Sequence, residues 1–199
     1  MPAGAYEPSL FRTYSNKIGM WLFIVSDSLT FGALLFAYSY GRISTPNWPT
    51  PFHNESIITA SVMTAFLLTS SLTMVLAVSA AGMGNRKKTI TWLAATIFCG
   101  VAFVVLHALE WRGLIHEGMT PSQNPWGAAQ FGGTFFTLTG LHMLHVTIGV
   151  VILAVIAFRS WGKKFSAQDV EVSGLYWHFV DLVWMFIFPL VYLMSTRIE

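Results

Sequence analysis

The segment Leu175-Tyr176-Trp177-His178-Phe179-Val180-Asp181-Leu182-Val183-Trp184 opens the last long apolar run of the chain and contains a histidine and an aspartate three positions apart. Three residues are close to one turn of an α-helix, so both side chains would project from one face and be able to touch. An ionisable side chain at membrane depth costs roughly 2.5–3.5 kcal/mol on insertion scales, so it is seldom retained without a partner or a task. His178 and Asp181 are therefore expected to form a polar clasp between helices or part of a proton or lipid site.

The composition of this 199-residue chain is that of a membrane protein. Apolar residues make up 54% and charged residues only 10%, and most charges fall in short clusters between apolar runs. The formal net charge of +2 is too small and too scattered to indicate a nucleic-acid partner. The single cysteine, Cys99, excludes an internal disulfide and a Cys-x-x-Cys metal or redox motif.

Five apolar stretches are long enough to cross about 30 Å of hydrocarbon, which takes about 20 residues of α-helix. These stretches are residues 18–41, 56–81, 89–111, 131–158 and 174–195. Connections rich in glycine, proline or charge separate them. The sequence thus predicts an all-α membrane protein, with a cytoplasmic N-terminal arm (1–17) and a single domain (18–199) that forms a bundle of five transmembrane helices.

The distribution of basic residues predicts how this bundle is oriented. Eight lysine and arginine residues fall in the N-terminal arm and in the second and fourth connections, and three fall on the opposite side. The first group is Arg12, Lys17, Arg86, Lys87, Lys88, Arg159, Lys163 and Lys164, and the second is Arg42, Arg112 and Arg197. Because basic segments are retained on the cytoplasmic side, the N-terminus is expected in the cytoplasm and the C-terminus outside.

Every expected span except the second carries ionisable side chains. They are Asp27, His107, Glu110, His142, His145, His178 and Asp181. A di-iron carboxylate bundle would need Glu-x-x-His on two helices and two further glutamates, and bis-histidine haem would need histidines on opposed helices. The histidines and carboxylates match neither pattern. We therefore expect interhelical hydrogen bonds or lipid contacts, with no catalytic residue and no metal ligand among them.

Asp27 follows Ser26 near the middle of the first span. Apolar surroundings favour the neutral form of a carboxyl group, which makes Asp27 a candidate for proton exchange and for reaction with hydrophobic carbodiimides. The alternative is a protonated acid bonded to a helix carbonyl or to a neighbouring histidine. This alternative is favoured over an obligatory proton relay, because the chain shows no continuous ladder of acids. With the predicted orientation, Asp27 and the His178/Asp181 pair lie at similar depth in the cytoplasmic half, and Glu110 lies toward the other face.

Two long motifs resemble subunit III of haem–copper terminal oxidases. They are residues 131–149, which contain His142 and His145, and residues 176–184, which contain His178 and Asp181. Residues 19–27 are similar to that family's first retained helix, and residues 107–111 to its glutamate-bearing middle helix. The resemblance covers the chain from Lys17 onward. Five spans match the short bacterial form, which lacks the two extra helices that form one arm of a lipid cleft in seven-helix members. Asp27 stands where many members have the carbodiimide-reactive glutamate.

The resemblance implies a non-redox subunit of a multi-pass complex in the bacterial inner membrane that reduces O₂ to water and pumps protons. Such a subunit packs on subunit I beside subunit II, binds phospholipid, and supports proton uptake and the stability of the catalytic subunit. It implies no cofactor held by this chain, with haem and copper in partner subunits. Electrons would reach the complex from cytochrome c, because residues 186–192 look more like that branch of the family than like the quinol branch.

Three other interpretations stay open at this point. Two lie within the family, namely subunit III of a quinol oxidase and the accessory protein associated with nitric-oxide reductase. A stand-alone transporter or proton channel would also explain buried acids. Against it stand the lack of paired broken helices and of an internal repeat, which many transporters have.

Overall fold

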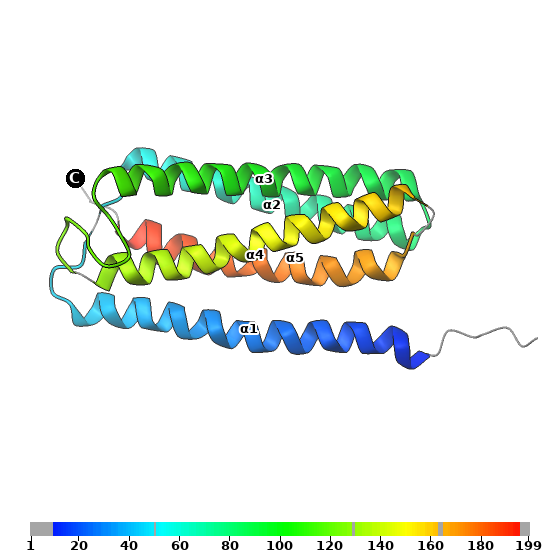
Figure 1. Ribbon diagram of the computed structural model, residues 1–199, viewed down its shortest axis with the longest axis horizontal. Coiled ribbons are helices and arrows are strands. Elements are labelled where there is room, and N and C mark those ends of the chain that lie inside the picture. The colour runs from blue at the N-terminus through cyan, green and yellow to red at the C-terminus, as the bar shows by residue number, and fades with distance from the viewer. Residues whose placement is uncertain (1–9, 50, 129, 163–164, 196–199) are drawn as a thin grey trace, which may run out of the picture.

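The computed structural model describes residues 10–49, 51–128, 130–162 and 165–195, and it describes side chains within the first helix from residue 15 onward. The chain forms five long helices, which lie side by side along the length of the bundle (Figure 1). They are α1 (Leu10–Ser44), α2 (Asn54–Gly82), α3 (Arg86–His116), α4 (Gln130–Trp161) and α5 (Ala167–Ile187), and α5 continues as η1 (Phe188–Tyr192) and η2 (Leu193–Ser195).

All five predicted spans are helices that are long and apolar enough to cross a membrane, which confirms the predicted fold class. The helices extend beyond the predicted spans. The last one begins at Ala167 rather than near residue 174, because Ser166 caps it by accepting a hydrogen bond from the backbone N–H of Asp169 at 3.2 Å. The helix α1 begins at Leu10, within the expected N-terminal arm, whose residues 1–9 lie outside the described part of the chain.

Proline accounts for the change of helix type near the end of the chain. Pro189 has no backbone N–H and its ring clashes with the preceding turn, so it cannot continue a regular α-helix. At this point the backbone changes to the π-helical turn η1 and then to the short 3₁₀ turn η2. The turn keeps Tyr192 fully buried in the bundle.

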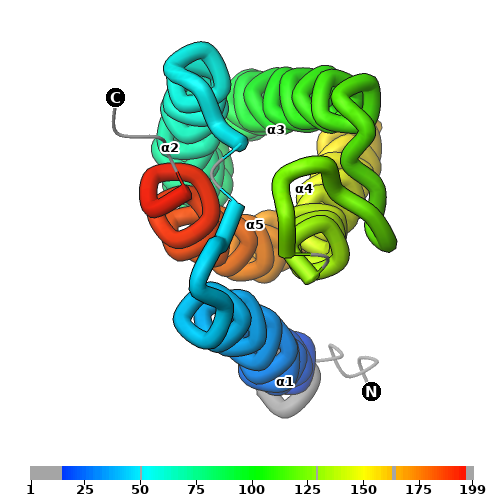
Figure 2. Tube along the Cα trace, turned by 90° about the vertical axis from the view of Figure 1, so that its left-hand side faces the viewer, coloured from blue at the N-terminus to red at the C-terminus, as the bar shows by residue number. Residues whose placement is uncertain are grey.

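The helices α2, α3, α4 and α5 surround a common centre, and α1 lies outside them (Figure 2). The outer helix packs only on α4 and α5 to any extent. One face of α1 is correspondingly apolar and open, with Leu22, Leu29, Phe36 and Ile43 all exposed at intervals of seven residues. A stripe with this spacing is directed to lipid or to another membrane subunit.

Short hydroxyl side chains on α2 hold α5 against it. Ser70 accepts a hydrogen bond from the indole N–H of Trp177 at 3.0 Å, and Thr64 accepts one from Trp184 at 2.9 Å. Both tryptophans are buried, so their N–H groups need such partners. Such hydrogen bonds between helices are the ones that set helix register within a membrane.

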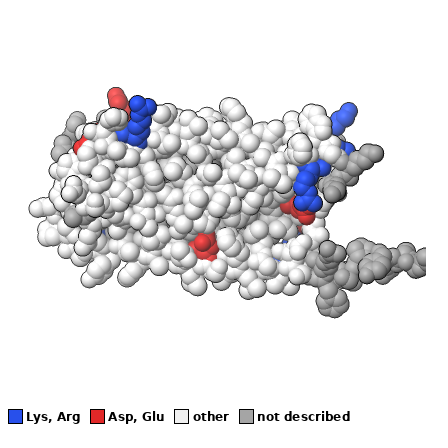
Figure 3. Space-filling view, in the orientation of Figure 1, with Lys and Arg blue, Asp and Glu red and all other residues white. Residues whose placement is uncertain are grey.

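Charged side chains gather at the two ends of the bundle, and the middle of the visible face is almost free of them (Figure 3). The end at which α1, α3 and α5 begin carries the described cations of the larger basic group, and there Lys17 forms an ion pair with Glu171 at 2.6 Å. Arg42 and Arg112 belong to the opposite end. Lys163, Lys164 and Arg197 lie outside the described residues. Which end faces the cytoplasm stays a prediction.

Candidate functional site

The first polar site joins α1 to α4 near the middle of the bundle. Asp27 Oδ2 lies 3.2 Å from His145 Nε2, and the two side chains are 14% and 11% exposed. The other ring nitrogen, His145 Nδ1, lies 2.8 Å from the carbonyl oxygen of Leu141, one turn back on α4. Asp27 therefore has a histidine partner, which was one of the two interpretations drawn from the sequence.

The contact between His145 Nδ1 and the carbonyl oxygen of Leu141 determines which nitrogen of the neutral histidine ring carries the hydrogen. A carbonyl oxygen can only accept, so His145 Nδ1 must carry the hydrogen that it donates to Leu141. In the neutral ring Nε2 then has a lone pair and no hydrogen. The contact with Asp27 is attractive only if one proton lies between the two groups, on the carboxyl group or on the imidazole ring.

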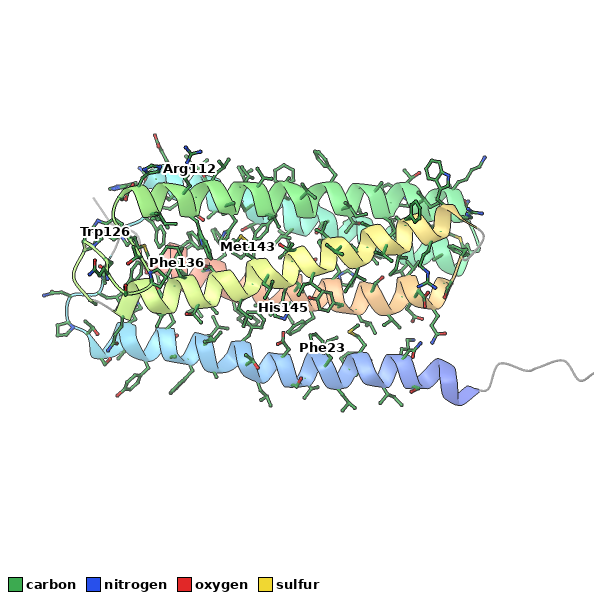
Figure 4. All side chains as sticks on the ribbon, in the orientation of Figure 1. Phe23, Arg112, Trp126, Phe136, Met143 and His145 are labelled. Atoms are coloured by element: carbon green, nitrogen blue, oxygen red, sulfur yellow. The ribbon has the colours of Figure 1, made fainter. Side chains whose placement is uncertain are left out.

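Aromatic side chains enclose the same pair. The ring of Phe31 meets that of His145 edge-on, with 5.3 Å between centroids, and Tyr176 stacks against His145 at 6.4 Å. Tyr176 also donates a hydrogen bond from its hydroxyl to the carbonyl oxygen of His145 at 3.0 Å. Figure 4 shows His145 and Phe23 in the layer between α1 and the α4–α5 pair. This packing orients the histidine and limits water around it.

The second polar site lies between α5 and α2. His178 Nδ1 is 2.9 Å from the hydroxyl oxygen of Ser71, so the histidine clasps α2. Asp181 is buried one turn further along α5. No ion pair or hydrogen bond joins His178 to Asp181 within the described part of the chain. His178 and Asp181 lie on one helix face, as their spacing requires. The hydrogen-bond partner of His178 lies on α2, however, and the partner of Asp27 lies on α4.

The third polar site lies toward the end of the bundle where α3 ends. Tyr192 donates a hydrogen bond to Glu110 Oε2 at 2.8 Å, and His107 Nδ1 lies 3.5 Å from the same oxygen. His107 is fully buried, and Glu110 is nearly so. The sequence spacing brings His107 and Glu110 together, as expected. Tyr192 was not expected, because it is 82 positions away and an apolar run gives no signal for it.

His142 takes part in none of these pairs. It lies in an aromatic core, stacked on Trp184 with 5.2 Å between centroids and edge-on to Phe103 at 5.6 Å. The spacing of His142 and His145 could have allowed both to hold one ion, but His145 is directed to α1. Among the described residues no three histidine, cysteine, aspartate or glutamate side chains converge on a point that could hold a metal ion.

Comparison with known proteins gives one family over nearly the whole chain. The family model for cytochrome c oxidase subunit III matches residues 9–196. Subunit 3 of the cytochrome bo(3) ubiquinol oxidase of Pseudomonas aeruginosa is 34% identical over 92% of this chain and 86% of its own length. Cytochrome c oxidase subunit 3 of Alkalihalophilus pseudofirmus is 35% identical over 91% of this chain and 88% of its own, and quinol oxidase subunit 3 of Bacillus spizizenii is 32% identical over 90% and 87%.

Family match, relatives and fold agree with one another. Five helices able to cross the membrane and relatives from bacterial oxidases make the chain a multi-pass protein of the bacterial plasma membrane and a subunit of a respiratory oxidase complex. Both the cytochrome c and the quinol branches occur among relatives of nearly equal identity. This chain therefore belongs to the cytochrome c oxidase subunit III family.

Proposed function

We propose that this chain is the non-redox subunit III of a haem–copper oxidase that takes electrons from cytochrome c, reduces O₂ to water and pumps protons. It packs on subunit I in a complex with subunit II, which together hold haem and copper, and it supports proton uptake and the working lifetime of subunit I. The observation that carries this role is the 3.2 Å contact between Asp27 and His145, which brings a carboxyl group and an imidazole ring together between α1 and α4 at membrane depth.

Phospholipid is the ligand that we assign to the chain itself. A groove of about 600 Å³ lies between α1, α4 and α5. Apolar residues such as Met20, Val151 and Val155 line it together with Arg159 and Asp169, whose side chains form an ion pair at 3.8 Å. Apolar walls suit acyl chains and the guanidinium group suits a phosphate headgroup, so the groove fits one lipid lying along α1.

The electron donor separates the leading proposal from its nearest rival, subunit III of a quinol oxidase. The proposal for cytochrome c rests on the resemblance of residues 186–192 to that branch. The relatives support the two branches about equally. Neither the nitric-oxide-reductase accessory protein nor a stand-alone transporter gains support from them.

Purification of the native complex through a tag on this chain tests the assignment. We expect the chain to retain two larger oxidase subunits, and the complex to consume O₂ with reduced cytochrome c as donor. Oxidation of a quinol but not of cytochrome c by the same complex would move the chain to the quinol branch. Recovery of the tagged chain alone, with ion or solute transport in proteoliposomes, would contradict the subunit assignment.

Replacement of Asp27 by asparagine tests the role of the shared proton. Asparagine has nearly the same shape but cannot give up a proton to His145, so proton uptake should slow and the enzyme should lose activity earlier during turnover. Membrane contacts of this kind contribute roughly 0.6–1.7 kcal/mol, so we expect the working lifetime to fall roughly threefold to twentyfold. The initial rate of O₂ consumption should fall less than the working lifetime or proton uptake.

Ser28→Ala is the matched control for this experiment. Ser28 lies beside Asp27 on the exposed side of α1, and its hydroxyl bonds only to the carbonyl oxygen of Ile24 in its own helix. The control should leave lifetime and proton uptake unchanged. If Asp27→Asn behaves like this control in both assays, the Asp27–His145 contact serves packing alone.

A further inference from the structure

A groove of about 350 Å³ runs between α2 and α3 at the end of the bundle where α2 begins and α3 ends. The predicted orientation places this end outside the cell. Polar side chains line the groove on the α2 side, and on the α3 side two glutamates lie among leucines and a glycine. The lining residues are Glu55, Ser56, Thr59, Leu106, Leu109, Glu110, Gly113, Leu114 and Glu117.

Three of the α3 positions form one stripe that leads inward from the helix end. Glu117, Gly113 and Glu110 are spaced by four and three residues, so they lie on one helix face. Seven residues of helix correspond to about 10 Å, which takes the stripe from the exposed Glu117 to the buried Glu110. Gly113 has no side chain to close the path, and a Cβ atom placed there would meet nothing within 4 Å.

Glu110 forms the inner end of this groove, and one of its carboxyl oxygens has no hydrogen-bond partner among the described residues. Its side chain is 6% exposed. Tyr192 donates to Oε2, but Oε1 is buried and has no hydrogen-bond partner among the described residues. A buried carboxyl oxygen at the end of a polar groove is well placed to gain and lose a proton from the aqueous phase. The ionisable groups that surround it are Glu55 on α2, His107 and Glu117 on α3, and Tyr192 on η1.

Beyond Glu110 the polar path continues to His107 and ends there. His107 lies behind Glu110, but aromatic rings separate His107 from His142 on α4, since Phe103 and Trp184 each pack against both histidines. The nitrogens of both histidines have no hydrogen-bond partner in the described part of the chain. A proton on Glu110 can therefore reach His107 but meets a wall of apolar rings after it.

We propose that Glu110 is a proton-exchange site of its own, open through the α2–α3 groove to the aqueous phase at the outer end of the bundle and closed toward the Asp27–His145 pair. Its ligand is a proton carried by water along the groove. The exposed carboxylates Glu55 and Glu117 attract cations, hydronium included, to the entrance. This site lies on a different helix pair from Asp27 and does not depend on the identity of the electron donor.

Infrared difference spectroscopy of the purified oxidase complex during exchange from H₂O to D₂O tests this site. The carbonyl-stretch band of protonated Glu110 should shift rapidly on exchange and should be missing in Glu110→Gln. Asp181 is also buried, but it lines none of the described grooves, so its band, identified with Asp181→Asn, should exchange more slowly.

Two variants that keep Glu110 test the route rather than the residue. Gly113→Leu places a side chain in the groove at a position where a Cβ atom meets nothing within 4 Å, so it should slow the exchange of the Glu110 band by roughly tenfold while leaving the band in place. Gly32→Leu on α1, where a Cβ atom also meets nothing within 4 Å, is the matched control and should leave the rate unchanged. The double variant Glu55→Gln/Glu117→Gln should slow exchange less, and the loss should diminish in high salt.

Specific results would overturn the proposal. They are the absence of any Glu110-dependent band across the pH range tested, exchange as slow as that of Asp181, and exchange unaffected by Gly113→Leu. Each would leave the oxidase assignment intact, because that assignment is judged by copurification and by O₂ consumption. If the unchanged chain neither copurified with oxidase subunits nor supported O₂ consumption, the oxidase assignment would be contradicted. That result would not bear on the exchange rate of Glu110.

Discussion

Replacement of Trp177 by alanine is expected to lower the free energy of unfolding by about 3–5 kcal/mol, the range for removal of a large buried aromatic side chain. Trp177 is 1% exposed and lies where four helices meet. Its indole N–H donates to Ser70 on α2, and its ring packs on Gly100 of α3 and Gly149 of α4. Alanine would leave a cavity at this junction, because the surrounding helices can close only part of it.

The single cysteine gives a direct measurement of this loss. Cys99 is buried, so maleimide labelling of Cys99, followed by mass spectrometry while the complex is heated, reports opening of the bundle. Trp161→Ala is the control, since Trp161 is 76% exposed, and it should label like the unchanged protein. Ser70→Ala removes the hydrogen bond from Trp177 and the one that the Ser70 hydroxyl donates to the carbonyl oxygen of Leu67, but it leaves the Trp177 ring in place, so it should cost only about 0.6 kcal/mol. Equal labelling of the Trp177 and Trp161 variants would contradict the central position of Trp177.

Adding one carbon atom at Gly100 should also destabilise the bundle, by about 1–3 kcal/mol, because it overpacks the same junction. A Cβ atom on Gly100 would lie 2.6 Å from the Trp177 ring and 2.7 Å from a methyl group of Val150. Both distances are far inside van der Waals contact, so α3 would have to move away from α4 and α5. We expect Gly100→Ala to unfold at lower detergent stress in a titration with sodium dodecyl sulfate, followed by circular dichroism.

Gly113→Ala provides a control in the same helix. A Cβ atom at Gly113 meets nothing within 4 Å, and alanine favours helix over glycine by up to about 1 kcal/mol. This variant should therefore be as stable as the unchanged chain or slightly more so. Adding Val150→Ala to Gly100→Ala removes one of the two clashing groups and should restore part of the stability. If Gly100→Ala and Gly113→Ala unfold at the same detergent concentration, the close approach of Trp177 and Val150 to Gly100 is contradicted.

The polar residues of the spans show which side-chain contacts can be predicted from the sequence and which cannot. His107 and Glu110 were expected together and are together, since both lie on one helix with a spacing that places them on one face. Asp27 was expected to exchange protons or to bond to a helix carbonyl or a neighbouring histidine, and the fold supplies His145. His178 and Asp181 were expected to form a polar clasp between helices or part of a proton or lipid site, and the fold joins His178 to Ser71 on α2. Contacts within a helix follow from spacing, whereas contacts between helices need the rotation of each helix.

The sequence alone determined that five helices cross the membrane, because a helix in hydrocarbon satisfies its own backbone hydrogen bonds and needs only a long enough apolar run. That property is local and can be read residue by residue. Only the tertiary structure decided that α1 lies outside a ring of four helices, that Asp27 meets His145, and that Tyr192 and the α2–α3 groove meet at Glu110. These contacts join residues far apart in the chain, and they depend on how the packing of glycine, tryptophan and hydroxyl side chains sets the position of every helix at once.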